Sequence, residues 1–415
     1  MRTTPFWTAA LAVALVGCGG GNETTTTTSS SGAKSVAKPA NYAEDVAFLK
    51  KHVEVIELGT GEGPGLVIVP EYQGRVMSST FDVKAGKSIG FINHDVVAKG
   101  EITKGMTAFG GEDRIWLGPE GGQFSIYFND GEEQNGDNWQ TPPVIDSETY
   151  DVATKSATEA TFTKTAAIKN SSGTEFKFTI ERTVALLSAS DARADLGVEV
   201  PASVQTVAYE SRNTLKNAGE NEWTKDKGLL SIWILSMYKH SPTTNVIVPY
   251  NPGSGPVVKD DYFGKVPGDR LVDAGGYLVF KADGQYRSKI GLTPQRAKNV
   301  AGSWDSGNNV LTIVQYNKPS GVTDYVNSMW AAKQDDPYAG DVVNSYNDGP
   351  FAPGQKPMGP FYEIETSSPA LALKPGGSYT HVHRTFHFTG DKASLQAIAT
   401  AVLGVDLDAV AAALP

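Results

Sequence analysis

The chain has 415 residues, with 36 lysines and arginines against 46 aspartates and glutamates, which gives a formal net charge of −10. This acidic balance, without any block of basic residues, argues against a nucleic-acid-binding surface. The length allows two average domains, but 44 glycines and 23 prolines favour one large, loop-rich β domain.

Residues 1–17 predict a lipoprotein signal peptide. Arg2 supplies a weak positive charge, and residues 6–16 form an apolar stretch that is too short to cross a bilayer. Cys18 follows Gly17 directly, which resembles the bacterial lipobox, whose cysteine is lipidated after cleavage. The alternative is an ordinary signal peptide with an incidental cysteine. Because Cys18 is the only cysteine of the chain, an intrachain disulfide is excluded.

Residues 18–40 predict a flexible tether, since they are rich in threonine, serine and glycine and offer almost nothing to a hydrophobic core. Gly19, directly after the cysteine, resembles the pattern that sorts lipoproteins to the outer membrane. We therefore expect a protein of the bacterial cell envelope, held by a lipid anchor in the outer membrane on its periplasmic or surface side.

Residues 41–390 predict one mainly β domain that opens with a short helix, which Asn41 caps and Glu44 supports three residues later. After this helix, short runs of β-branched and aromatic residues alternate with turn clusters. The predicted strands cover residues 66–69, 75–83, 88–92, 123–128, 160–168, 175–186, 204–215, 229–237, 245–248, 277–281, 289–292 and 310–316. This spacing is typical of a large antiparallel sandwich.

Residues 391–415 predict a helical appendage at the end of the chain. Alanine, leucine and valine recur there at helical spacing, aspartates precede both helical stretches, and Gly404 separates them.

The segment 359–390 holds the densest group of proton-transfer side chains. Glu365 lies on a first predicted strand, and His381, His383 and His387 share one face of the next. Three imidazoles on one strand face could hold a metal ion, or they could hydrogen-bond to neighbouring groups. Because thiolate ligands and a His-Glu-x-x-His helix are both lacking, we expect no metal and no other cofactor.

Four segments together resemble the galactose-mutarotase-like superfamily, which includes aldose 1-epimerases and many sugar-binding domains. They are residues 66–81, the glycine-flanked arginine segment 110–128, the strand pair 211–219 and 231–237, and the strand pair 365–388. The resemblance spans residues 55–390. It implies an antiparallel β-supersandwich with short terminal helices and a carbohydrate ligand.

The resemblance also implies site residues. Arg114 takes the position of a sugar-binding arginine, and Glu365 takes that of the catalytic base, although each could instead form a structural ion pair. In true epimerases one strand carries a histidine that acts as the general acid. The matching strand of this chain, residues 231–237, has Trp233 at that position. We therefore expect His383 or His381 to supply the acid, and we expect both to converge with Arg114 and Glu365 in one pocket.

Aromatic and rim residues complete the predicted site. Trp116 and Trp233 are expected to form part of its wall, against which the C–H face of a sugar can stack, although tryptophans of a sandwich also serve the core. His94 follows a predicted strand and belongs either to the polar rim or to a turn.

Two functions remain open. The first is a membrane-anchored, monomeric lipoprotein that binds carbohydrate on a concave sheet face and acts as an epimerase or mutarotase. The second is a non-catalytic glycan-binding or structural lipoprotein of the envelope. The missing histidine at position 233 favours binding alone, whereas the three histidines of 381–387 favour chemistry.

Overall fold

The computed structural model describes residues 41–59, 61–351 and 354–415. The predicted signal peptide, its lipidation site Cys18 and the predicted tether lie outside the described residues. No helix in the described ranges is both long and apolar enough to cross a membrane.

Three antiparallel sheets form the domain. The smallest has the order β1-β2-β3, the largest β11-β12-β10-β14-β15-β18-β8-β7-β6-β5, and the third β13-β16-β17-β9-β4. The strands are β1 Ile56–Leu58, β2 Gly65–Val69, β3 Arg75–Thr80, β4 Arg114–Gly118, β5 Asp151–Lys155, β6 Glu159–Lys169, β7 Glu175–Leu186, β8 Gln205–Asn217, β9 Ser231–Lys239, β10 Thr244–Pro249, β11 Leu271–Asp273, β12 Tyr277–Lys281, β13 Ser288–Leu292, β14 Val300–Asp305, β15 Val310–Tyr316, β16 Val343–Asn347, β17 Phe361–Ser367 and β18 Ser378–Thr389. The predicted fold class, mainly antiparallel β, is confirmed.

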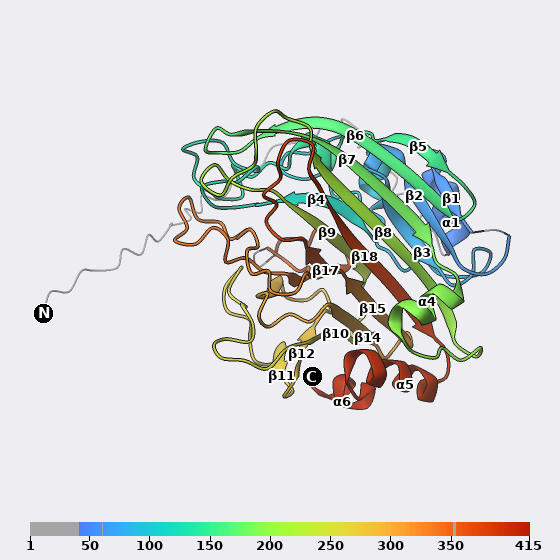
Figure 1. The fold of residues 1–415 in the computed structure, drawn as a ribbon. Coiled ribbons are helices and arrows are strands. Elements are labelled where there is room, and N and C mark those ends of the chain that lie inside the picture. The colour runs from blue at the N-terminus through green and yellow to red at the C-terminus, as the bar shows by residue number, and fades with distance from the viewer. Residues whose placement is uncertain (1–40, 60, 352–353) are drawn as a thin grey trace, which may run out of the picture. The chain divides into compact units, whose positions relative to one another are not determined.

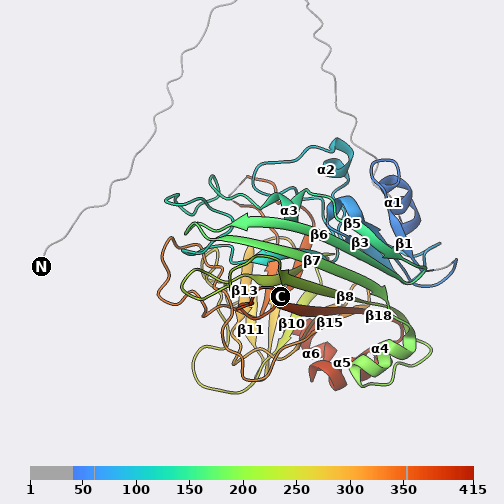
Figure 2. The same cartoon turned by 45° about the horizontal axis from the view of Figure 1, so that its top comes forward.

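Short helices flank the sheets, as predicted. They are α1 Tyr42–Leu49, the 3-10 turn η1 Pro70–Tyr72, α2 His94–Lys99, α3 Pro143–Asp146, α4 Ala189–Leu196, α5 Lys392–Leu403 and α6 Leu407–Ala412. Helix α1 lies beside the three-stranded sheet, and α5 and α6 lie at one end of the long strands β8 and β18 (Figures 1 and 2). Leu395 and Val410 of these last helices share one hydrophobic cluster with Trp304 and Phe386 of the ten-stranded sheet.

Side-chain alternation explains how the large sheet divides core from solvent. In β7, Phe176, Phe178 and Ile180 are buried, while Lys177 between the first two and Glu181 after the third are exposed. This period of two places one face of the strand against the core. In contrast, β9 is buried over eight of its nine residues, from Ser231 onward, which indicates that both faces of the five-stranded sheet are covered.

Several strand predictions were wrong or incomplete. Residues 123–128 form no strand and instead lie in turns after the short strand β4. Residues 88–92 contribute only single bridges, at Gly90 and Ile92. Strands β14 and β16 were not predicted, because their glycine, serine and asparagine residues weaken the local β signal, and pairing with both neighbours stabilises them instead.

A polar layer lies between the five-stranded and ten-stranded sheets. Arg182 of β7 and Asp113, which directly precedes β4, form a fully buried ion pair with 2.7 Å between Nη2 and Oδ1. Arg182 also donates through Nε to the carbonyl of Gly74, and Ser211 of β8 donates to the other oxygen of Asp113. These contacts join the turn before β3 and the start of β4 to the ten-stranded sheet.

The three histidines of β18 belong to this polar layer. His381 and His383 are fully buried, and both contact the hydroxyl of Thr366 in β17 at 2.9 Å. His387 pairs with the buried carboxylate of Glu112 at 2.8 Å. The histidines therefore fill the space between two sheets rather than an open concave face.

We expect Asp113→Asn to lower the free energy of unfolding by about 3–5 kcal/mol, because it leaves the guanidinium of Arg182 buried without its counter-charge. Urea denaturation followed by circular dichroism measures this change. Lys177→Ala is the matched control on β7, since its ion pair with Glu175 is exposed, and it should cost less than about 0.5 kcal/mol. Similar losses in both variants would contradict a structural role for the buried pair.

Stability should also depend on pH through the two buried histidines. Burial lowers the pKa of His381 to about 3 and that of His383 to about 4, from an ordinary value of 6.5. Between about pH 6.5 and 4 the unfolded chain therefore binds protons that the folded chain does not bind. The free energy of unfolding is thus highest above about pH 6.5 and falls as the pH drops toward 4.

Each histidine adds a slope of up to about 1.4 kcal/mol per pH unit. Urea titrations at pH 7, 6 and 5 should show this fall, and His383→Gln should flatten it even if the variant is less stable throughout. If His383→Gln shows the same dependence of stability on pH as the unaltered protein, then His383 is not buried as a neutral imidazole.

Candidate functional site

A cavity with a volume of about 630 Å³ lies on the face of the five-stranded sheet that points away from the ten-stranded sheet. Its floor is made of alternate residues of neighbouring strands. Arg114 of β4, Leu235 of β9, Glu365 of β17 and Asn344 of β16 are successive partners in one row across the sheet. Because side chains alternate along a strand, all four lie on the same face.

Two ion pairs lie on this floor. The guanidinium Nη2 of Arg114 lies 2.6 Å from Oε1 of Glu363, and Nζ of Lys289 lies 2.8 Å from Oε2 of Glu365. The indole N–H of Trp233 also donates to Oε2 of Glu365, at 3.0 Å. Burial raises the pKa of Glu363, and Arg114 opposes this rise. Burial disfavours the charged form of Lys289, but attraction to Glu365, Glu120 and Glu363 together outweighs this effect and raises the pKa of Lys289.

Five buried side-chain atoms of cavity residues have no hydrogen-bond partner within the part of the chain that the structure describes: Arg114 Nε, Trp116 Nε1, Trp139 Nε1, Asp341 Oδ1 and Glu365 Oε1. Two of these atoms are of opposite kinds. One is the acceptor Oε1 of Glu365, and the other is the donor Nε1 of Trp116. Buried polar groups are nearly always paired in proteins, so each of these atoms calls for an explanation. A ligand group that both donates and accepts, such as a hydroxyl, would satisfy both atoms.

Four tryptophans form one wall of the cavity: Trp116, Trp139, Trp233 and Trp330. The rings of Trp116 and Trp233 meet edge to face at 5.6 Å, and the Arg114 guanidinium lies 4.5 Å from the centre of the Trp116 ring. Trp330 is 37% exposed, so its ring is open to the cavity mouth. Four further aromatic residues line the cavity: Tyr262, Phe263, Tyr346 and Phe351.

Glu120 adds a carboxyl group to the cavity that the sequence reasoning did not assign to the site. It lies two residues after β4, and its backbone N–H donates to the hydroxyl of Ser328. Burial raises the pKa of Glu120 to about 7, with Lys289 opposing the rise and the nearby carboxylate of Glu365 adding to it. At neutral pH, Glu120 is therefore a carboxyl group that can give up or take a proton.

The structure brings together four of the residues assigned to the site from sequence: Arg114, Trp116, Trp233 and Glu365. It does not bring the histidines to them. Because Thr366 directly follows Glu365, its side chain points to the other side of β17, and it is Thr366 that His381 and His383 contact. The expected acid–base pair of Glu365 with His383 or His381 is therefore wrong.

His94 also lies outside the cavity. It is the first residue of α2, and its Nε2 lies 2.6 Å from the buried carboxylate of Asp45 in α1. Its ring meets that of Phe48 at 4.8 Å. These contacts join the two helices, so the assignment of His94 to the rim of the sugar site is wrong.

Sequence reasoning missed several residues that contact the cavity, chiefly Lys289, Asn344 and Glu363. Glu363 could have been found, since it lies two residues before Glu365 and must share its face. Lys289 and Asn344 carry no such signal, because only the strand order β13-β16-β17 places them beside Glu365.

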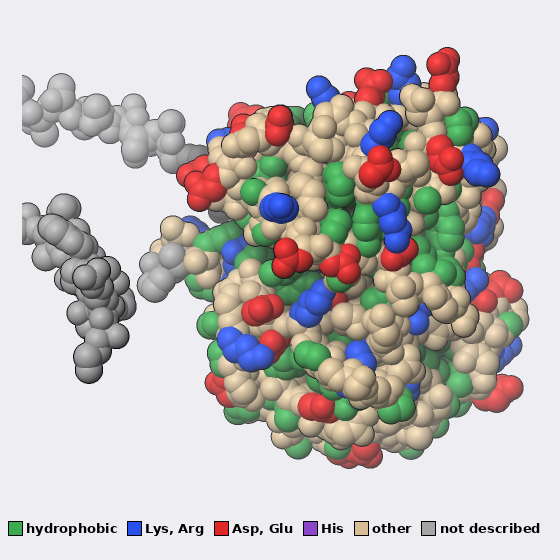
Figure 3. Space-filling view, turned by 60° about the vertical axis from the view of Figure 1, so that its left-hand side comes forward, with side chains coloured by type: hydrophobic (Ala, Val, Ile, Leu, Met, Phe, Trp, Pro, Cys, Tyr) green, Lys and Arg blue, Asp and Glu red, His purple; other side chains and the backbone are tan. Residues whose placement is uncertain are grey.

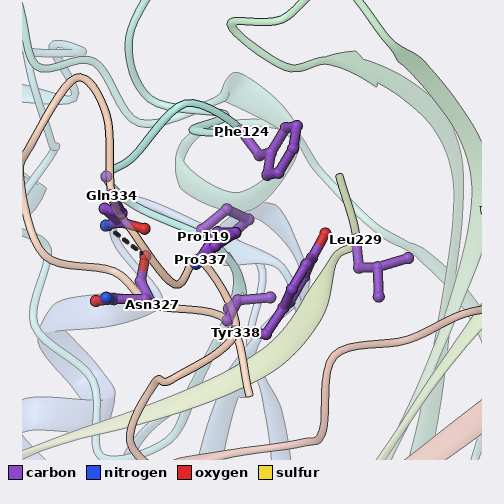
Figure 4. A pocket seen from close by; sticks show the side chains of 9 residues that line it. Pro119, Phe124, Leu229, Asn327, Gln334, Pro337 and Tyr338 are labelled. Carbon is purple, nitrogen blue, oxygen red and sulfur yellow. Dashed lines mark hydrogen bonds between the residues drawn. The ribbon is translucent and has the colours of Figure 1, made fainter. Parts of the chain in front are cut away.

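Two other observations bear on ligands. In the ranges 41–59, 61–351 and 354–415, no group of three histidine, cysteine, aspartate or glutamate residues is arranged to hold a metal ion. A second, smaller hollow lies beside the cavity, and Figure 4 shows that apolar side chains such as Pro119, Phe124 and Leu229 line it. It has no room for a water molecule, so it is a packing gap.

Solved structures share this fold at low sequence identity. A candidate aldose 1-epimerase from Escherichia coli K12 is 10% identical, with a TM-score of 0.50, and the match covers 81% of this chain and 99% of that one. A galactose mutarotase-like protein from Lactobacillus casei is 13% identical, with a TM-score of 0.46 and coverage of 80% and 100%. The first match confirms the predicted galactose-mutarotase-like β-sandwich, and it shows the fold alone.

At the level of sequence, a comparison with curated proteins finds no match. One family model matches residues 40–414, nearly the whole of the chain that follows the predicted tether. The chain thus belongs to DUF6786, a family of unknown function.

Proposed function

We propose that the protein binds carbohydrate in the cavity on the five-stranded sheet. The observation that carries this proposal is the pair of buried, unpartnered atoms, Glu365 Oε1 and Trp116 Nε1, beside a wall of indole rings. A sugar hydroxyl donates and accepts at once, and the C–H face of a sugar ring packs on an aromatic ring. The volume of about 630 Å³ is in the usual range for small-molecule sites.

The charges on the cavity floor support a neutral sugar ring there. Arg114 and Glu363 neutralise each other, as do Lys289 and Glu365. Such pairs hold their side chains in fixed positions, so a ligand meets oriented donors and acceptors without meeting a net charge. On the face of the molecule that Figure 3 shows, side chains of both charges lie scattered among hydrophobic and other side chains.

A second candidate function, sugar epimerisation by proton transfer, is favoured by the carboxyl pair of Glu365 and Glu120. Lys289 and Trp233 hold Oε2 of Glu365, which leaves Oε1 to take the proton of an anomeric hydroxyl. As the bond between the ring oxygen and the anomeric carbon breaks, Glu120 gives its proton to the ring oxygen. The open-chain sugar then recloses on either face, and both protons return.

We also propose that Cys18 is lipidated and anchors the protein to the bacterial outer membrane. The support is the position of the only cysteine directly after an apolar stretch of the right length. The polar composition of residues 18–40 would let the domain move away from the bilayer.

Trp330→Ala should weaken sugar binding by about 3–10-fold, because it removes one stacking ring worth about 0.5–1.5 kcal/mol. A glycan array identifies the sugars that bind, and isothermal titration calorimetry then measures each affinity. Val152→Ala is the control, since Val152 is similarly exposed but lies on β5, outside the cavity lining. Failure of any sugar to bind the unaltered protein would overturn the proposed function.

Glu365→Gln should abolish anomer exchange while keeping most of the sugar affinity, because it removes the base but keeps a polar group of the same size. NMR exchange spectroscopy with a bound sugar measures the rate. Glu120→Gln should lower that rate by about 10²–10⁴-fold. In the unaltered protein the rate should fall above about pH 7, as Glu120 loses the proton that it donates.

Two other results would be informative. Equal loss of rate and affinity in Glu365→Gln would mark Glu365 as a binding residue. If the unaltered protein binds a sugar but does not change its anomer exchange, the protein is a binding protein and the epimerase candidate is wrong.

Cys18→Ala should move the protein from the membrane fraction to the soluble fraction of the envelope and abolish labelling by a radioactive fatty acid. Its melting temperature should not change if residues 18–40 are a tether. A variant that stays in the membrane fraction and still takes up the label would contradict lipidation at this cysteine.

A further inference from the structure

We propose that Arg287 forms a carboxylate-binding subsite at the cavity, so that the carbohydrate bound there is a uronic acid or a chain that contains one. This inference rests on the proposed function, since it names the class of sugar that the same cavity takes. It concerns a residue that the epimerase resemblance does not involve.

The guanidinium of Arg287 is held between two aromatic rings of the cavity wall. Its central carbon lies 3.7 Å from the centre of the Phe263 ring and 4.4 Å from that of Phe351. Both rings are partly open to solvent, at 40% and 47% exposure. The plane of the guanidinium is thus fixed by apolar surfaces, while its edge remains accessible to a ligand.

A hydrogen bond fixes the guanidinium further. Nε of Arg287 donates to the hydroxyl of Tyr346 at 3.2 Å, and this hydroxyl donates to Oδ1 of the buried Asp348 at 2.9 Å. The other oxygen of Asp348 accepts from the backbone N–H of Gly359. Asp348 therefore orients Arg287 through Tyr346 without forming an ion pair with it.

The buried carboxylate of Asp348 attracts the guanidinium of Arg287 electrostatically, but the two groups form no direct ion pair. Among the residues that the structure describes, Arg287 forms no ion pair, whereas Arg114 and Lys289 on the cavity floor each have a carboxylate partner. Besides these residues and Glu120, three further charged residues line the cavity. Lys104 and Asp137 are exposed, so solvent screens them, whereas the buried Asp341 is already engaged by Lys259 and by the hydroxyl of Tyr262. The guanidinium of Arg287 thus has a fixed orientation and remains available to bind an anionic group of a ligand.

The geometry favours a carboxylate over a phosphate. A planar guanidinium with two free terminal nitrogens matches the two oxygens of a carboxylate, and a single positive charge balances its single negative charge. A phosphate group carries up to two charges and is commonly held by several backbone N–H groups or cations, which the wall of Phe263, Tyr346 and Phe351 does not supply.

The test compares matched sugars that differ only at one carbon. D-glucuronate, D-galacturonate and D-mannuronate are measured against D-glucose, D-galactose and D-mannose, with the three hexose 6-phosphates as a third arm. Isothermal titration calorimetry gives the affinities for the full-length protein and for Arg287→Gln. We expect at least one uronate to bind the unaltered protein about 10-fold or more tightly than its neutral partner.

In Arg287→Gln the preference for the uronate should disappear. The affinity for the uronate should fall by about 10–100-fold, and the affinity for the neutral sugar by less than about 2-fold. The neutral sugar therefore reports whether the cavity is still intact. Arg212→Gln is the matched control, because it removes an equal charge from β8, outside the cavity lining, and it should leave every affinity unchanged.

The outcomes separate the two proposals. Equal binding of uronates and neutral sugars, or a uronate preference that survives in Arg287→Gln, would overturn the subsite and leave carbohydrate binding in place. Preference for the hexose phosphates would also overturn it, since the anion would then be a phosphate. If none of the sugars and no glycan on an array binds, the proposed function itself fails.

Discussion

The buried ion pair of Arg182 and Asp113 is the contact on which the rest of the site depends. Asp113 directly precedes Arg114, so fixing its carboxylate fixes the start of β4 and directs the next side chain to the opposite face, into the cavity. The guanidinium of Arg182 also donates a hydrogen bond to the carbonyl of Gly74, and this contact fixes the turn before β3. A charge pair without access to water tolerates little displacement, because each partner left alone would be a buried charge.

Strand β17 serves two polar regions at once. Glu363 and Glu365 point into the cavity, whereas Thr366, next in the chain, points to the histidines between the sheets. The two regions are separated by the thickness of one sheet, so they cannot exchange protons directly. Burial keeps His381 neutral near pH 7, as suits a hydrogen-bonding group of a core and not a general acid.

The proposed proton transfer in the cavity therefore relies on the carboxyl groups of Glu365 and Glu120. Glu365 is paired with Lys289, whereas Glu120 has no such direct ion pair within the described part of the chain, and burial raises the pKa of Glu120 to about 7. The aromatic walls would exclude water around a bound ring and strengthen each polar contact. Arg287 directly precedes β13 and contacts the rings of Phe263 and Phe351, so the proposed recognition of charge and the proposed proton transfer use different residues of one cavity.

The sequence by itself was enough to predict an antiparallel β fold with short terminal helices, and to place Arg114, Trp116, Trp233 and Glu365 in one site. The fold prediction rests on periodicity among neighbouring residues, whereas the grouping of these distant residues in one site rests on the ordered resemblance of four segments. Tertiary structure alone decided that the β18 histidines lie behind the sheet and that Lys289 lies beside Glu365. The physical reason is that a strand's period of two shows which residues share a face, whereas long-range pairing decides which sheet the strand joins and what its faces meet.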